Sequence, residues 1–418
     1  MVKPVVDQIF ELILQGRLDE VENISNPEDA VYIRTVVSTE EKGGTHVGVD
    51  LEEITKVAPW ITPFFLGPRL LFSSKSIAVQ NMMTGGKSNF LLDWSFSFDS
   101  NVAEKVRAYV NLENINAKDR DRVITLLKLK KKFSLQTDLL PFLLENLRLS
   151  RSDIKNERPL NTVIAFKKLD YLDWQAFEKN PLKPEFICDE KTLLKDANDT
   201  YDSMVNDKEV KKWEYKSLFT QVILFELAII WLRKNGSIEE QFSELIDFCV
   251  LQLGKLAKFE LKFAWRFLNQ PTRTRFFGPL NGVSKDLTKA LKGMAWDMTH
   301  LRLLETLSTK TTFDSFYVPF FVSFDEKFSE ILKQNQLQML LVDDRLKRMH
   351  TATIDEYPFL QKLDSCMSEK TRSLMGEVES EARRSYNIPE NDLKHIIALQ
   401  TIELERLAAQ ERIFRQKK

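Results

Sequence analysis

The chain has 418 residues, of which 60 are basic and 61 acidic, so its formal net charge is −1 at pH 7. This balance excludes a general electrostatic affinity for nucleic acids or anionic membranes and leaves room only for local basic patches. The 29 Phe, 7 Trp and 8 Tyr residues exclude a mainly disordered chain, and 13 Gly with 14 Pro exclude a collagen-like one.

The cysteines indicate a reducing compartment. Cys188, Cys249 and Cys366 are odd in number and far apart, which argues against a disulfide framework and favours a cytoplasmic protein. The N-terminus lacks the features of a secretory signal. The most apolar run, Leu218 to Leu232, is shorter than the roughly 20 residues of a membrane span and contains Glu226. It therefore predicts a buried helix and no membrane partner, with Glu226 paired, solvated or at a site.

Three domains are predicted along the chain. Residues 1–85 form an N-terminal module that begins with an amphipathic helix and continues in short strands, and its fold is left open. Residues 86–350 form an α/β core with a large helical insertion at about 150–285. Residues 351–418 form a helical C-terminal extension, whose last part has the charge pattern of a coiled-coil arm or docking helix.

Carboxylates follow the apolar runs of the predicted core. In FLLDW the run ends in Asp93, whereas the longer segment SFSFD alternates more clearly and ends in Asp99, so the two compete as the first acid. A helix over 139–150 carries Glu145. The predicted strand in FYVPFFVSFD ends in Asp325, directly before a helix.

Long helices follow the first strands. They are predicted over 216–234, 238–269 and 285–309, and the last of them carries Asp297 with His300 one turn later. A further apolar strand is predicted over 336–344.

The chemistry of the chain points to carboxylates. The sequence contains no GxxxxGK[ST], GxGxxG, HExxH or GxSxG motif, and its four histidines have no metal-ligand spacing. Acids at the carboxyl ends of parallel strands meet in one crevice, where they repel one another unless a cation lies between them. Oxygen ligands favour Mg²⁺ or Mn²⁺, ions that activate water for phosphodiester cleavage.

The order of these segments resembles the PIN-like ribonuclease family. The resemblance rests on strand-Asp93-Trp-Ser95, a helix with Glu145, Asp297-x-x-His300-Leu301, and Val322-Ser323-Phe324-Asp325-x-x-Phe328. It implies a three-layer α/β/α core with a mainly parallel sheet. It also implies Mg²⁺ or Mn²⁺ bound by Asp93, Glu145, Asp297 and Asp325 as the catalytic acids, with Ser95 and His300 beside the substrate. The long separation of Glu145 and Asp297 departs from compact family members and requires the helical insertion.

Each of these residues also has a purely structural interpretation. Asp93 suits a turn, Glu145 a solvated helix face, Asp297 a helix dipole and Asp325 a helix N-cap, while His300 suits packing. Outside the resemblance, the loop PTRTRFFGP places the cations Arg273 and Arg275 beside two aromatic rings, which together suit contact with RNA. The residues favour a plain salt-bridged loop over this contact.

The sequence thus predicts a metal-dependent endoribonuclease, in a regulated toxin-like or host-defence context. The alternative is a non-catalytic helical scaffold or adaptor, whose C-terminal helices bind a partner or a second copy. DNA in place of RNA as the substrate is left open.

Overall fold

The computed structural model describes residues 4–21, 23–24, 32–40, 51–85, 90–152, 156–311, 315–375 and 387–417. The chain folds into two compact units. Unit 1 comprises Met1–Val210 and Leu303–Ile354, and unit 2 comprises Lys211–Arg302 and Asp355–Lys418. These units differ from the domains predicted at 1–85, 86–350 and 351–418, because each unit combines segments that are distant in the sequence.

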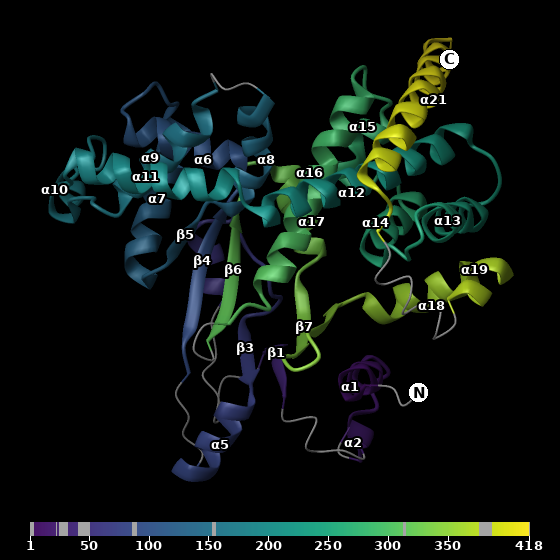
Figure 1. Ribbon diagram of the computed structural model, residues 1–418, viewed down its shortest axis with the longest axis horizontal. Helices are drawn as coiled ribbons and strands as arrows, with labels where there is room; N and C mark the ends of the chain where they lie inside the picture. Colours follow the sequence, from purple (N-terminus) through teal and green to yellow (C-terminus); the bar gives the residue numbers. More distant parts are fainter. Residues whose placement is uncertain are drawn as a thin grey trace. The chain divides into compact units, whose positions relative to one another are not determined.

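Unit 1 contains all the strands of the described residues (Figure 1). Its strands are β1 (Ile33–Thr39), β2 (Ile61–Pro63), β3 (Arg69–Ser73), β4 (Leu92–Phe98), β5 (Gln136–Asp138), β6 (Phe316–Val322), β7 (Leu337–Asp343) and β8 (Arg348–Thr353). Its helices are α1 (Val5–Leu14), α2 (Leu18–Val21), α4 (Glu52–Val57), α5 (Lys75–Thr84), α6 (Ser100–Val110), α7 (Ala117–Phe133), α8 (Leu140–Ser152), α9 (Arg158–Leu169), α10 (Trp174–Lys179), α11 (Glu190–Val205) and α17 (Glu326–Gln334).

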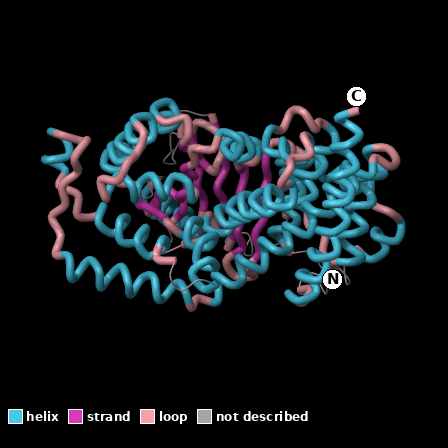
Figure 2. Tube along the Cα trace, turned by 90° about the horizontal axis from the view of Figure 1, so that it is seen from above, coloured by secondary structure: helices cyan, strands magenta, loops and turns pink. Residues whose placement is uncertain are grey.

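Two four-stranded sheets form the centre of unit 1, and Figure 2 shows their strands lying together among helices. The first sheet, β3-β1-β7-β8, is antiparallel throughout. The second, β2-β6-β4-β5, pairs β4 with β5 and β6 in parallel and β2 with β6 antiparallel. The predicted mixed α/β class is therefore confirmed, whereas the prediction of a mainly parallel sheet is wrong: most strand pairs are antiparallel.

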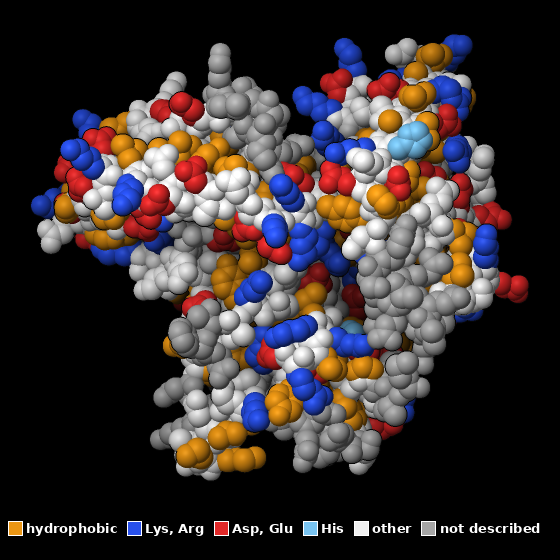
Figure 3. All heavy atoms as spheres, viewed as in Figure 1, with side chains coloured by type: hydrophobic (Ala, Val, Ile, Leu, Met, Phe, Trp, Pro, Cys, Tyr) orange, Lys and Arg blue, Asp and Glu red, His pale blue; other side chains and the backbone are white. Residues whose placement is uncertain are grey.

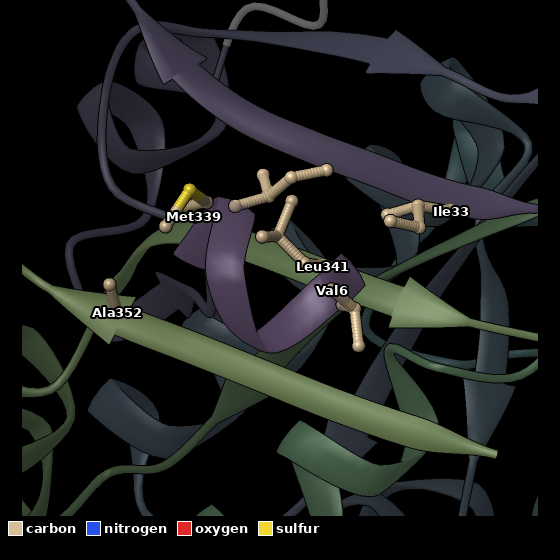
Figure 4. Packing of buried hydrophobic residues seen from close by; sticks show 6 residues of the cluster. Val6, Ile33, Met339, Leu341 and Ala352 are labelled. Atoms are coloured by element: carbon tan, nitrogen blue, oxygen red, sulfur yellow. The ribbon is translucent and has the colours of Figure 1, made fainter. Parts of the chain in front are cut away.

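The first 85 residues do not form a module of their own. Strand β1 pairs with β7, which lies about 300 residues later, in the register Thr35 opposite Leu341. Helix α1 covers the same sheet, where Val6 and Ile33 pack with Leu341 in one buried apolar cluster (Figure 4). The N-terminal segment thus completes the core of unit 1.

Unit 2 is helical in its described residues. It contains α13 (Ile238–Asp247), the π-helix η1 (Phe248–Gln252), α14 (Lys258–Asn269), the 3₁₀ turn η2 (Arg275–Phe277), α15 (Gly278–Asn281), α18 (Glu356–Cys366), α19 (Glu369–Leu374) and α21 (Glu390–Gln416). The helices α12 (Lys208–Arg233) and α16 (Leu287–Leu307) carry the chain from one unit to the other. The long helices predicted from periodicity are thus present, although a π-helix and a loop interrupt the stretch 238–269.

Helix α12 contains the most apolar run of the sequence. It is the one helix among the described residues that is long and apolar enough to cross a membrane, but 67% of its apolar window is buried inside the protein. This burial is that of a core helix in a soluble protein. Glu226 within it accepts a hydrogen bond of 2.9 Å from Gln400 Nε2, and burial raises the pKa of its carboxyl.

A cationic pair in unit 2 holds the start of α18. Lys262 Nζ lies 3.0 Å from Asp355 Oδ1 and 2.7 Å from Glu356 Oε2, and Arg266 Nη2 lies 2.6 Å from Asp355 Oδ2. Partial burial raises the pKa of Asp355, but Arg266 and Lys262 outweigh it and lower this pKa to about 2. Because the folded pKa is depressed, the ionised carboxylate stabilises the fold above its unfolded value of 3.8, and this contribution is lost as the pH falls toward 2.

Asp355→Asn is accordingly expected to lower the free energy of unfolding at pH 7 by about 1–2 kcal/mol. This loss is smaller than that expected from breaking a fully buried ion pair, because Asp355 is partly exposed. The difference from wild type in urea unfolding should shrink steadily between pH 4 and pH 2. A difference that stays constant over this range would contradict the ion-pair assignment.

Candidate functional site

The parallel strands β4 and β6 end side by side in unit 1 (Figure 1). Phe98 is opposite Val322 in the register, so Asp99 and Ser323 both follow the last paired residues. The Asp99 amide still donates to the Val322 carbonyl at 3.1 Å, which fixes the two turns against each other. Helices α6 and α17 begin directly after these turns, so two positive helix ends lie at the same sheet edge.

Asp99 is the most buried acid of this edge, with only 8% of its surface exposed. Its Oδ2 accepts hydrogen bonds from Asn101 Nδ2 at 2.6 Å and Ser323 Oγ at 2.7 Å. The pKa of Asp99 is raised to about 7: burial is the main cause, the charges of Glu145 and Asp325 add to it, and the hydrogen bond from Ser323 opposes it. Glu145 and Asp325 are therefore each close enough to Asp99 to repel its carboxylate.

Glu145 reaches this edge from helix α8, which packs on β4. Its Oε2 accepts a hydrogen bond of 2.5 Å from Ser100 Oγ, the residue after Asp99. Asn146 Nδ2 donates to the same hydroxyl at 2.9 Å and to the Phe142 carbonyl at 2.8 Å. The hydroxyl of Ser100 thus orients the Glu145 side chain toward the end of β4.

Asp325 is the N-cap of α17, as its structural interpretation predicts. Its Oδ1 accepts from the amides of Lys327 at 2.7 Å and Phe328 at 3.4 Å, and its own amide donates to Ser323 Oγ at 3.1 Å. Ser323 therefore connects Asp99 with Asp325. Unlike Asp99, Asp325 is exposed to solvent.

Asp93 does not end a strand, which corrects the predicted position. It is the second residue of β4, opposite Tyr317, and it lies six positions before Asp99. In extended chain this is roughly 20 Å, too far for both to bind one ion. Of the two competing first acids, Asp99 is the one that the fold brings together with Glu145 and Asp325.

Ser95 lies on the same face of β4 as Asp93. It hydrogen-bonds to the hydroxyl of Tyr317 and borders a pocket of about 270 Å³ that Asp138 and Lys310 also line. Asp138 accepts from Ser97 Oγ at 2.8 Å, and burial raises its pKa. Ser95 therefore lines a polar pocket. It lies away from the acid edge, which is the sheet edge that carries Asp99, Glu145 and Asp325, and its substrate contact stays a prediction.

The remaining predicted site residues belong to unit 2. Asp297 is half-buried and His300 fully buried on α16, so their roles stay predictions. Arg273 and Arg275 are exposed, as RNA contact would require. The two adjacent rings, however, are buried at 3% and 0% exposure in the core of unit 2, so they cannot stack on a base. The predicted aromatic platform beside the arginines is therefore wrong.

A pocket of about 510 Å³ lies near β5 in unit 1, bordered by Lys130, Lys131 and Trp174. Lys130 pairs with Asp170 at 3.6 Å and Lys131 with Glu178 at 2.6 Å. These acids compensate the positive charge, so the pocket has no strong preference for an anion.

The donor chemistry at the acid edge fits a hard cation. It comprises three carboxylates with hydroxyl and amide oxygens nearby, which is the ligand type of Mg²⁺ and Mn²⁺. Within the described part of the chain, no three His, Cys, Asp or Glu side chains are already arranged to share one metal ion. Each carboxylate instead has protein hydrogen bonds that a bound cation would rearrange.

From the sequence alone, no role at the site was assigned to Ser100, Asn101 and Ser323. Their side chains donate hydrogen bonds to Glu145 and Asp99. All three flank acids, in the segments Asp99-Ser100-Asn101 and Ser323-Phe324-Asp325. The alternation of polar and aromatic residues over β4 indicated a strand that continues to Phe98 and is followed by Asp99. No family model, curated protein or solved structure matches the chain.

Proposed function

We propose that unit 1 is a PIN-like, divalent-metal-dependent endoribonuclease whose acids are Asp99, Glu145 and Asp325. One observation carries the proposal: the ends of two neighbouring parallel strands and helix α8 bring Glu145 and Asp325 close to Asp99, whose pKa is raised by burial and, to a smaller extent, by the charges of these two acids. Gathering like charges is unfavourable for folding, and a cation bound among them would remove that cost.

The residues of the edge have distinct tasks in this proposal. Asp99, Glu145 and Asp325 hold Mg²⁺ or Mn²⁺, while the hydroxyls of Ser100 and Ser323 orient the carboxylates. The ion would supply an activated water and stabilise the leaving oxygen of a phosphodiester. The starts of α6 and α17 favour a phosphate at the same edge.

RNA is the substrate that the family resemblance implies, and single-stranded DNA is the competing substrate. We place the enzyme in the cytoplasm, since Cys188, Cys249 and Cys366 are all free thiols. Because an unregulated ribonuclease harms its own cell, we propose a toxin-like or host-defence role under the control of other parts of the chain.

The test is cleavage of labelled single-stranded RNA and DNA by the full chain with Mn²⁺, Mg²⁺ or EDTA. Wild type should cleave RNA only when a divalent ion is present, and Glu145→Gln should lower the rate by about 10²-fold or more. Glu190→Gln, an exposed acid of α11 in the same unit, is the matched control and should cleave like wild type.

Equal cleavage by wild type and Glu145→Gln would contradict the proposed site. Cleavage of DNA alone would retain the site and change the substrate.

A further inference from the structure

The pocket beside Ser95 in unit 1 is lined by hydroxyl groups. Ser95 is only 2% exposed and hydrogen-bonds there to the hydroxyl of Tyr317. Ser97, on the same face of β4, donates to Asp138 Oδ2 at 2.8 Å. Burial raises the pKa of Asp138, so this carboxyl repels a nearby anion less than an exposed one would. A hydroxyl both donates and accepts hydrogen bonds, and its natural partner is another hydroxyl, such as that of a sugar.

The same pocket has a cation at its border. Lys310 is exposed there, and within the described part of the chain no acid forms an ion pair with it. In the larger pocket, by contrast, Lys130 and Lys131 are both paired. Figure 3 shows basic and acidic side chains intermixed over α10 and α11, so an anion site in this unit depends on local groups. An ammonium group of this kind binds phosphate as a point charge.

The size and walls of the pocket fit one sugar with its phosphate. Its volume of about 270 Å³ equals that of about nine water molecules at roughly 30 Å³ each. Leu139 and Leu307 supply apolar wall for the carbon atoms of a sugar ring. Helix α8 begins beside the pocket, and the positive end of its dipole favours a phosphate. A base attached to that sugar would lie outside the pocket.

We propose that this pocket binds one ribose and its phosphate within an RNA strand that leads to the acid edge, and that Ser95 and Tyr317 recognise the 2′-hydroxyl. Lys310 binds the phosphate. This inference rests on the proposed ribonuclease function, and it names the group by which the enzyme separates RNA from DNA, which lacks a 2′-hydroxyl.

The place of the pocket along β4 favours a strand over an isolated sugar phosphate. Ser95, Ser97 and Asp99 alternate along one side of the chain, so the pocket and the acid edge share that side. Four positions in extended chain span roughly 13 Å, which is about four nucleotides at the roughly 3.4 Å of a stacked step. Gln136 and Thr137 line both this pocket and the larger one, so a strand that leaves the pocket has space to continue.

Binding of the full chain to a labelled single-stranded RNA and to DNA of the same sequence, measured by fluorescence anisotropy in EDTA, tests the proposal. Without a divalent ion neither cleavage nor metal binding contributes, so failure here is distinct from failure of the nuclease proposal. Wild type should bind the RNA about two- to tenfold more tightly than the DNA, the effect of one additional hydrogen bond.

Tyr317→Phe should remove this preference by weakening RNA binding and leaving DNA binding unchanged. Tyr201→Phe, the same change on α11, is its control and should keep the preference. Lys310→Gln should weaken the binding of both nucleic acids and lower the slope of log affinity against log salt concentration by about one. Lys118→Gln, at an exposed lysine near the start of α7, should leave that slope unchanged. Far-UV circular dichroism confirms that each variant is folded.

Three results would overturn the proposal. The first is equal affinity of wild type for RNA and DNA, and the second is a Tyr317→Phe variant that retains the preference. The third comes from calorimetry with ribose 5-phosphate: binding of this compound by a chain that does not bind the RNA would assign the pocket to a free sugar phosphate.

Discussion

Asp99→Asn is expected to lower metal-dependent RNA cleavage by about 10²–10³-fold, the loss typical of removing one preorganised charge-stabilising group. Asparagine keeps the size of the side chain and an oxygen that accepts the hydrogen bonds of Asn101 and Ser323. It removes the negative charge that we propose binds the cation. The expected loss is therefore one of catalysis rather than of structure.

Asp93→Asn is the matched control for this experiment. It makes the same chemical change on the same strand, six residues before Asp99 and outside the acid edge, so its cleavage rate should stay within about twofold of wild type. The two variants are compared in initial rates at saturating Mn²⁺. A loss with Asp93→Asn and not with Asp99→Asn would reverse the choice of first acid.

The Asp99→Asn substitution is also expected to stabilise the metal-free protein at neutral pH. The pKa of Asp99 is raised from 3.8 to about 7, so the folded state binds a proton more tightly than the unfolded state. Stability is then lost as the pH rises from about 4 to 7, by at most about 1.36 kcal/mol per pH unit. Asp99→Asn removes this loss, which bounds the gain at about 4 kcal/mol above pH 7.

Urea unfolding in EDTA at several pH values from 4 to 8 measures this effect. The stability difference between Asp99→Asn and wild type should grow with pH and level off above about 7. Asp93→Asn should show no such pH-dependent gain. An Asp99→Asn variant that is less stable than wild type at pH 8 would show that the ionised carboxylate is already satisfied by its protein partners.

The elements that the sequence predicted well are those with long, consistent periodicity. The strands β6 and β7 and the helix α16 lie within a few residues of the predicted ranges, since their apolar patterns are long. Helix α12 ends where it was predicted to end but begins at Lys208, eight residues before the predicted start, because its first turns are polar and charged. The pairing of β1 with β7 had no local signal, because it joins segments about 300 residues apart in the chain. This single long-range pairing explains why the N-terminal residues looked like a separate module.

The candidate site was predictable in part. Glu145 and Asp325 were identified from their place on predicted elements, and Asp99 was the competitor of Asp93. Asp93 was favoured because an apolar run precedes it, yet β4 continues to Phe98, as the polar–aromatic alternation indicated. The contributions of Ser100 and Ser323 depend on how strand ends meet in space, and local spacing does not encode that.

The central claim is that Asp99, Glu145 and Asp325 form a divalent-cation site, and Mn²⁺ binding measured by calorimetry tests it most directly. Wild type should bind Mn²⁺ at neutral pH, while Asp99→Asn and Glu145→Gln should bind it at least about tenfold more weakly, and Asp93→Asn should bind it like wild type. Binding of equal affinity in wild type and in the Asp99 and Glu145 variants, or no binding by wild type, would contradict the claim.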